Sequence, residues 1–338
     1  MSKPTADQSA PSDAFIARFR ARASGDVARF DAFMDLALYD PEFGYYRRSG
    51  RRVGYGKGTD FFTATTSGPI FGELISAACA SLLKGHDLRD FHFLEIGAEP
   101  GGGVLRDVAH PFASARTIRV GEPIEITGNA IVFSNELFDA QPFRRFVFRS
   151  GNWNERYVRL QHGHFVEELR PAENYAFAAL PSSAPEGYQI DLPFASVELL
   201  RAIAAQPWRG LFLAFDYGKS WSELVEAQPA GTARAYFQHT QSNDLLARPG
   251  QQDLTCHVCW DWLTEVLASS GFSALALESQ EAFFVHHASD FIGAAIAAEA
   301  ARMSQRKLAL MQLLHPAHLG QKFQALHATR MAPCANSD

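Results

Sequence analysis

The chain has 338 residues, of which 47% are hydrophobic and 20% are charged, a composition typical of a globular protein. Its formal net charge is −6, so no general electrostatic attraction to nucleic acid or to an anionic membrane is expected. The sequence contains no run of about 18 apolar residues, and we therefore expect no insertion into a membrane.

The first stretch, residues 1–24, begins with small and polar residues, and we expect it to form a disordered leader. It lacks the apolar segment of a secretory signal. Arginines at positions 18, 20 and 22 faintly resemble a transit peptide, but Asp7 and Asp13 argue against one. A cytoplasmic protein is the resulting expectation.

Residues 25–90 are predicted to form an N-terminal region of helices and a flap. Apolar residues recur at helical spacing over residues 26–38 and again over 70–82. The loop between these helices is rich in glycine and, from Arg47 to Lys57, in basic residues. Such a loop is either a solvated excursion or a flap that closes over a ligand.

Residues 91–288 are predicted to form an α/β core. Short apolar runs that are continuous rather than alternating are typical of parallel strands covered on both faces. Four such runs occur, at FHFLEI (91–96), TIRV (117–120), AIVFS (130–134) and LFLAFDYG (211–218).

An antiparallel insert is predicted within this core, at about residues 143–200. Apolar and polar residues alternate over residues 143–170, with breaks at 150–152 and 162–164. We expect the insert to pack against the core or to enclose a pocket.

The end of the chain is predicted to close the core and then continue as helices. SALALE (273–278) and AFFVHH (282–287) are expected to pair as strands. Residues 289–338 are expected to form a helical tail, interrupted at His315-Pro316.

Four cysteines are too few and too scattered for a disulfide framework. Cys256 and Cys259 form a CxxC pair, but the sequence offers no second pair of ligands at zinc-binding spacing. We therefore expect structural cysteines and predict no metal site.

The stretch FHFLEIGAEPGGGVL (91–105) carries a buried strand into a glycine-rich turn. Ligands of open α/β folds bind at this edge of the sheet. The dinucleotide fingerprint G-x-G-x-x-G is absent, which disfavours a nicotinamide-dependent oxidoreductase. Glu95, Gly97 and Gly101 fit the looser pattern of S-adenosylmethionine (SAM) sites, whereas Glu99 occupies the position of the middle glycine.

Polar residues also gather at the end of the next predicted strand, in AIVFSNELFDAQPFRRF (130–146). Asn135, Glu136 and Asp139 follow this strand directly. Two interpretations stay open: the start of a helix with Ser134 or Asn135 as its cap, or the polar wall of an active site.

Seven stretches resemble, in order, the successive motifs of the MidA-type SAM-dependent methyltransferases. They are FMDLALYDPEFGYY, GTDFFTATTSGPIFGELI, LEIGA, FSNELFDAQPFRRF, LAFDYG, GTARAYFQHTQSNDLLARPGQQDLTCHV and HPAHLGQKFQAL. The resemblance runs from about Arg29 to Leu326, nearly the whole folded chain.

The resemblance implies an α/β, class I methyltransferase (Rossmann-like) fold, a three-layer sandwich with a seven-stranded sheet and extra N-terminal helices. It implies SAM as cofactor and a protein arginine methyltransferase linked to assembly of respiratory complex I, with a respiratory-complex subunit among the candidate protein substrates. It also implies a role for each residue that falls on a family motif. These residues are Glu95, Gly97 and Gly101 on the SAM loop, Asp60, Phe61 and Thr63 beside the pocket, Glu122 as the acid for the ribose, and Asn135, Glu136 and Asp139 at the catalytic motif.

The chemistry of arginine methylation favours these acids. A guanidinium is always protonated in water, and its nitrogen is a poor nucleophile until a proton is lost. Carboxylates that hold it by paired hydrogen bonds fix its orientation and stabilise the remaining charge, and Glu136 and Asp139 are the candidates.

A second hypothesis is a MidA-like scaffold or assembly protein that no longer binds SAM. Glu99 and the short stretch between Gly103 and Ile131, which leaves little room for a helix and a strand, favour this alternative. The sequence leaves open whether the chain is a monomer or a homodimer, and which protein is its substrate.

Overall fold

The computed structural model describes residues 11–48, 67–172, 180–299 and 304–331, and a six-stranded sheet forms its centre. The strand order is β15-β16-β9-β4-β2-β3, with β9, β4, β2 and β3 mutually parallel and β16 antiparallel to both of its neighbours. The strands are β2 (His92–Ile96), β3 (Ser114–Ile118), β4 (Gly128–Asn135), β9 (Trp208–Asp216), β15 (Ser273–Ser279) and β16 (Gln324–Arg330).

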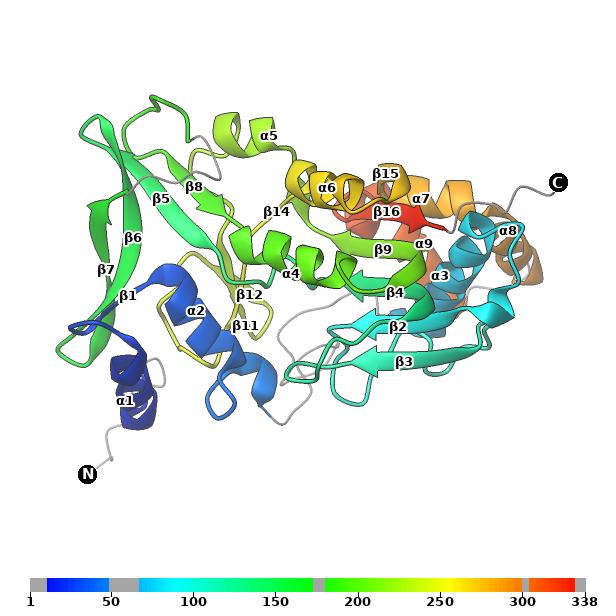
Figure 1. Cartoon of the computed structure of the whole chain (residues 1–338), viewed down its shortest axis with the longest axis horizontal. Helices are drawn as coiled ribbons and strands as arrows, with labels where there is room; N and C mark the ends of the chain where they lie inside the picture. The colour runs from blue at the N-terminus through cyan, green and yellow to red at the C-terminus, as the bar shows by residue number, and fades with distance from the viewer. Residues whose placement is uncertain (1–10, 49–66, 173–179, 300–303, 332–338) are drawn as a thin grey trace.

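Helices cover both faces of this sheet, as Figure 1 shows. Along β4, Ile131 and Phe133 pack into the cluster on one face, whereas Val132 packs into the cluster on the other. The runs at 91–96, 130–134 and 211–218 therefore indicated buried strands correctly, whereas the run at 117–120 did not, because β3 is an edge strand that is mostly exposed and ends at Ile118. The first face carries α3 (Pro69–Leu82), α7 (Gln280–His287), α8 (Ser289–Ala298) and α9 (Gln305–Leu314), and the second carries α4 (Phe194–Ala204) and α6 (Trp260–Ser269).

The predicted antiparallel insert supplies four strands of a five-stranded sheet, and β1 from the N-terminal region is the fifth; this sheet lies at the end of the molecule opposite α8 (Figure 1). Its hairpins turn at Ser150-Gly151 and His162-Gly163, the predicted breaks, and all four residues have positive φ angles between 51° and 80°. Two consecutive positive φ angles are typical of tight hairpin turns. The strands are β1 (Val27–Arg29), β5 (Arg144–Arg149), β6 (Asn152–Gln161), β7 (His164–Pro171) and β8 (Gln189–Leu192).

Smaller elements connect the insert to the central sheet. A three-stranded sheet of β11, β12 and β13 packs with α1 and α2 around a shared cluster of buried aromatic and aliphatic side chains. These elements are α1 (Asp13–Arg22), α2 (Phe30–Tyr39), β10 (Gly218–Lys219), α5 (Trp221–Glu226), β11 (Arg234–Phe237), β12 (Thr240–Ser242), β13 (Asp253–Thr255) and β14 (Val258–Cys259).

Two segments at the ends of the chain differ from the prediction. The leader contains helix α1, in which Ser12 caps the helix by accepting a hydrogen bond from the Phe15 N–H, and Phe15 and Phe19 are buried. The C-terminal tail is not wholly helical, because β16 returns to the central sheet between β9 and β15.

The predicted strand pair at 273–278 and 282–287 is also wrong in its second member. Ser279 Oγ accepts a hydrogen bond from the Ala282 N–H and so starts α7, which buries Phe283 and Phe284. The partner of β15 is β16 instead. Within the described residues the central sheet has one strand fewer than the seven that the family resemblance implies.

Cys79, Cys256 and Cys259 are buried free thiols, in keeping with structural cysteines. Among the described helices, none has the length and apolar character needed to cross a bilayer.

Candidate active site

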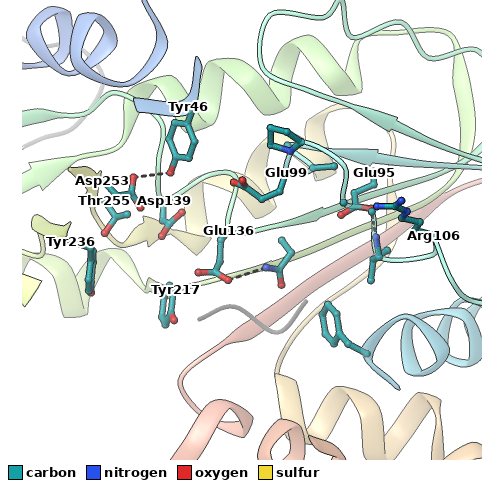
Figure 2. A pocket seen from close by; sticks show the side chains of 18 of the residues that line it. Tyr46, Glu95, Glu99, Arg106, Glu136, Asp139, Tyr217, Tyr236, Asp253 and Thr255 are labelled. Atoms are coloured by element: carbon teal, nitrogen blue, oxygen red, sulfur yellow. Dashed lines mark hydrogen bonds between the residues drawn. The ribbon is translucent and has the colours of Figure 1, made fainter. Parts of the chain in front are cut away.

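A cavity of about 860 Å³ opens at the carboxyl ends of β2, β4 and β9 (Figure 2). This volume lies within the range of small-molecule sites, and this edge of an α/β sheet is where ligands bind. The loop from Gly97 to Val104 forms one part of its wall, and residues of β11 and β13 form another.

Glu95 closes the glycine-rich loop from the end of β2. Its Oε2 accepts a hydrogen bond from the Val104 N–H at 2.6 Å, and burial raises the pKa of this carboxyl to about 7. A Cβ atom at Gly103 would lie 3.0 Å from Thr117 Cγ2 and 3.6 Å from Glu95 Oε2, so the loop packs closely on the strands below it. The main chain of the loop is thereby held along the cavity wall.

Glu99 lies on the acidic side of the cavity. Figure 2 shows its carboxylate turned toward Asp139 and Glu136, and away from Glu95 and Arg106. The charge of Glu99 contributes to raising the pKa of Glu136, after burial and the charges of Asp216 and Asp253. Glu99 therefore adds a charge to the cavity without covering the strand end at Glu95.

Asn135, Glu136 and Asp139 come together at the end of β4. No helix starts here, so the helix-cap interpretation is wrong; Glu136 takes a φ of 53° and the chain turns. Asn135 Nδ2 donates a hydrogen bond to Glu136 Oε1 at 2.9 Å, and the Glu136 N–H donates to the Phe215 carbonyl. The turn aims both carboxylates into the cavity (Figure 2).

Asp216, at the end of β9, fixes this turn. Its side chain accepts hydrogen bonds from the main-chain N–H groups of Phe138, Asp139 and Tyr217. Burial raises its pKa to about 7. The fixed turn holds Asp139 beside Glu136.

The two carboxyl groups strongly disfavour simultaneous ionisation. The pKa values of Glu136 and Asp139 are both raised well above their ordinary range by burial and then by the charge of Asp216. Within the described part of the chain, neither forms an ion pair, and Asp139 Oδ1 and Asn135 Oδ1 are buried acceptors with no hydrogen bond. A buried acceptor without a donor is costly, so these groups favour a cationic, hydrogen-bonding ligand.

The cations that line the cavity are held by main-chain carbonyls. Arg106 donates to the Gly101 carbonyl, and Arg234 Nη1 donates to the Ala233 carbonyl at 2.6 Å. His257 is kept neutral because burial lowers its pKa to about 4. Among the described lining residues, neither Arg106 nor Arg234 forms an ion pair with Glu136 or Asp139, so the cavity keeps its acidic centre.

Aromatic and acidic residues that the sequence analysis did not assign complete the wall. Tyr46 donates a hydrogen bond to Asp253 Oδ1 at 2.7 Å, and Tyr217 and Tyr236 line the cavity nearby (Figure 2). Asp253 lies in the motif stretch QQDLTCHV, which was the only sequence signal for it.

Glu122 is not among the residues that line the cavity. It is exposed in the turn after β3, where its Oε2 accepts a hydrogen bond from the Arg119 N–H. Asp60, Phe61 and Thr63, and most of the predicted flap, lie outside the described residues.

Known proteins share this fold and part of this sequence. The structure of a likely methyl transferase from Burkholderia thailandensis, solved with S-adenosyl-homocysteine bound, matches with a TM-score of 0.82 at 24% identity, over 98% of this chain and 95% of that one. An uncharacterized protein of the same superfamily and organism matches with a TM-score of 0.77 at 24% identity, over the same shares.

The fold is therefore the class I methyltransferase fold. Residues 115–277 also match the model of a family described as putative S-adenosyl-L-methionine-dependent methyltransferases. This match lies within the stretch over which the sequence motifs resemble the MidA-type methyltransferases.

The cavity fits SAM in its volume and in the charge of its lining residues. Gly97 and Gly103 line the cavity, and a Cβ atom at either position would lie 3.0 Å from a neighbouring side chain, so the main chain itself forms the wall there. The cofactor has a sulfonium and an ammonium group, and the acidic side at Glu99 and Glu136 complements both charges.

Proposed function

We propose that this chain is a SAM-dependent methyltransferase that methylates the side chain of an arginine in a partner protein. The observation that carries the proposal is the pair of buried carboxyl groups, Glu136 and Asp139, which lie beside the glycine-rich loop and lack a cation partner among the described residues. The family resemblance favours a respiratory-complex subunit as the protein substrate.

The acidic centre suits a guanidinium for two reasons. A guanidinium is permanently charged, so its entry restores the ionised form of carboxyls whose pKa values burial has raised. It also carries five N–H donors, which match acceptors such as Asp139 Oδ1 and Asn135 Oδ1.

The proposed mechanism assigns each residue a separate task. Bound SAM supplies an electrophilic methyl group on a sulfonium sulfur. Asp139 and Asn135 hold the guanidinium, so that one of its nitrogens keeps a fixed direction. A guanidinium nitrogen that took the methyl group from the sulfonium sulfur would have to lose a proton, and Glu136 Oε2 would be placed to accept it because Oε1 is already bonded to Asn135 Nδ2.

Glu95 and Asp216 act as positioning residues in this scheme. Glu95 holds the cofactor loop through Val104, and Asp216 holds the turn that carries Asp139. Tyr46, Tyr217 and Tyr236 give the cavity an apolar wall, which favours the exclusion of water.

The competing function is that of a scaffold without cofactor. Glu99 is the specific observation in its favour, because its side chain replaces a glycine in the SAM loop. Its direction toward Glu136 weakens this alternative, since the carboxylate leaves the part of the loop next to Glu95 open (Figure 2).

The test uses SAM labelled at its methyl group and a heat-treated cell extract as the source of protein substrates. After transfer, the labelled proteins are hydrolysed to amino acids. Label in methylarginine with the wild-type chain, and its loss in Glu136→Gln, is the expected result. Glu125→Gln is the matched control, because Glu125 is exposed and does not line the cavity.

Other outcomes would overturn parts of the proposal. Label in a different amino acid would reject arginine while keeping methyl transfer. No label, together with no binding of S-adenosylhomocysteine, would reject the methyltransferase and leave the scaffold.

A further inference from the structure

A second cluster of functional side chains lies away from the cavity, where β15, α7 and β16 meet. It consists of Glu278, His287 and His327, whose ligand atoms all lie within 4.8 Å of one another. None of the three lines the cavity described above.

The strand register brings the first two ligands together. Ala276 of β15 lies opposite His327 of β16, and Glu278 lies opposite Ala325. Glu278 and His327 are therefore diagonal neighbours on one face of the sheet, close enough for long side chains to meet. Helix α7 begins directly after β15 and delivers His287 from its last turn.

The three groups converge on a single oxygen atom. His287 Nε2 lies 3.0 Å from Glu278 Oε2, and His327 Nε2 lies 3.1 Å from the same atom. Ligand atoms placed about 2.05 Å from a tetrahedral zinc ion would be separated by roughly 3.3 Å. A small displacement of these side chains would thus admit an ion between them.

The surroundings resemble those of a bound ion. Phe283 is fully buried beneath the cluster, with its ring centroid 5.0 Å from that of His287 and 5.5 Å from that of His327. The side chains of Glu278, His287 and His327 are 16%, 21% and 7% exposed. Phe283 thus gives the cluster an apolar neighbour on its buried side. Glu278 and His287 are partly exposed to solvent, which leaves access for an ion and for a water ligand.

His286 supports the carboxylate from the other side. Its Nδ1 contacts Glu278 Oε1, whereas its own side chain is 60% exposed. A hydrogen bond of this kind orients a ligating carboxylate without taking part in coordination.

We propose that Glu278, His287 and His327 bind one divalent transition-metal ion, and that this ion is Zn²⁺. Two imidazole nitrogens and one carboxylate oxygen form a ligand set that Zn²⁺ accepts, with water in the fourth position. The ion clamps α7 onto β15 and β16, the strand pair that closes the central sheet. The ligands are 9 and 49 residues from Glu278 along the chain, so no short motif reveals them.

The experiment measures zinc binding to the full chain without an affinity tag. The protein is treated with a chelator, dialysed into metal-free buffer and titrated with ZnCl₂ in a calorimeter. One site per chain is expected. Glu278→Gln and His287→Ala should each weaken binding by at least about 100-fold, whereas the exposed His164→Ala should leave it unchanged.

Two further measurements separate a loss of zinc binding from a loss of the fold. Binding of S-adenosylhomocysteine by each variant reports whether the rest of the fold is intact. Titration of the wild-type chain with Co²⁺ requires no variant, and visible absorption bands of a tetrahedral site are expected. No saturable Zn²⁺ binding up to about 0.1 mM, or equal binding by wild type and both ligand variants, would overturn the proposal and leave an ion-pair network.

Discussion

The Oε2 atom of Glu95 accepts a hydrogen bond from the main-chain N–H of Val104, 2.6 Å away. This hydrogen bond joins the end of β2 to the far end of the glycine-rich loop. The carboxyl group of Glu95 therefore holds the two ends of the loop together. Because the carboxyl is buried, the same bond links the shape of the loop to the protonation of Glu95.

A pH dependence of stability follows from this burial. The pKa of Glu95 is about 7 in the folded chain, against an ordinary value of 4.5. Between these two values the folded chain holds a proton that the unfolded chain has lost, so the free energy of unfolding falls as pH rises. At about 1.4 kcal/mol per pKa unit, the contribution of Glu95 is up to about 3 kcal/mol.

Glu95→Gln isolates this contribution, because glutamine retains an acceptor for the Val104 N–H and cannot ionise. Urea unfolding at about pH 5 and about pH 8 should show a smaller loss of stability in the variant than in the wild type. Asp216, Glu136 and Asp139, whose pKa values are also raised by burial, contribute to the slope that remains. Equal slopes in the two proteins would contradict the role of Glu95.

Removal of either acid of the pair should stop transfer while sparing cofactor binding. Glu136→Gln removes the proposed proton acceptor, and Asp139→Asn removes a carboxylate that holds the guanidinium. We expect kcat/KM to fall by about 100-fold or more in each. Steady-state kinetics with the identified substrate, beside calorimetry with S-adenosylhomocysteine, check this expectation. A variant with full activity would remove that residue from the mechanism.

The charge of Glu99 should influence the pKa of Glu136 and thereby the pH dependence of the reaction. Its charge is one of those that raise the pKa of Glu136, after burial, Asp216 and Asp253. In Glu99→Gln the pKa of Glu136 should therefore fall, and the acid limb of the pH–rate profile should move to lower pH by up to about one unit. A shift toward higher pH, or none, would show that Glu136 does not set this limb.

Helix α3 should support the cofactor loop through a close contact at Gly72. A Cβ atom there would lie 2.0 Å from the Val104 carbonyl oxygen, a main-chain atom that cannot turn away. Gly72→Ala should destabilise the fold by about 1–3 kcal/mol and weaken the binding of S-adenosylhomocysteine.

Gly293→Ala is the matched control, because Gly293 also lies within a helix but has no atom near the Cβ position. The free energy of unfolding of this variant, measured by thermal or urea unfolding, should rise by about 0.5–1 kcal/mol. Equal effects of the two substitutions would contradict the proposed contact between α3 and the loop.

The parts of the fold that the sequence predicted correctly are those with local patterns. The apolar run at 130–134 predicted β4 because both of its faces are buried, and the alternation over 143–170 predicted the hairpins. Long-range pairing was missed: β16 enters the sheet beside β9, more than a hundred residues away in the chain, and its short apolar pattern does not identify a partner.

In the candidate site, too, residues that are close together in the sequence were predicted, whereas contacts between distant residues were missed. Asn135, Glu136 and Asp139 were found because they follow one strand directly, and the structure brings them together. Tyr46 and Asp253 were missed, since a hydrogen bond across 207 positions joins them. Glu122 was expected in the site from its place after β3, but the turn leaves it exposed.

The most direct test of the account is calorimetric titration of the wild-type chain with S-adenosylhomocysteine. We expect one saturable site, with affinity unchanged in Glu122→Gln because this residue lies outside the cavity. An absence of binding up to millimolar concentration, in protein that unfolds cooperatively, would contradict the methyltransferase and favour the scaffold.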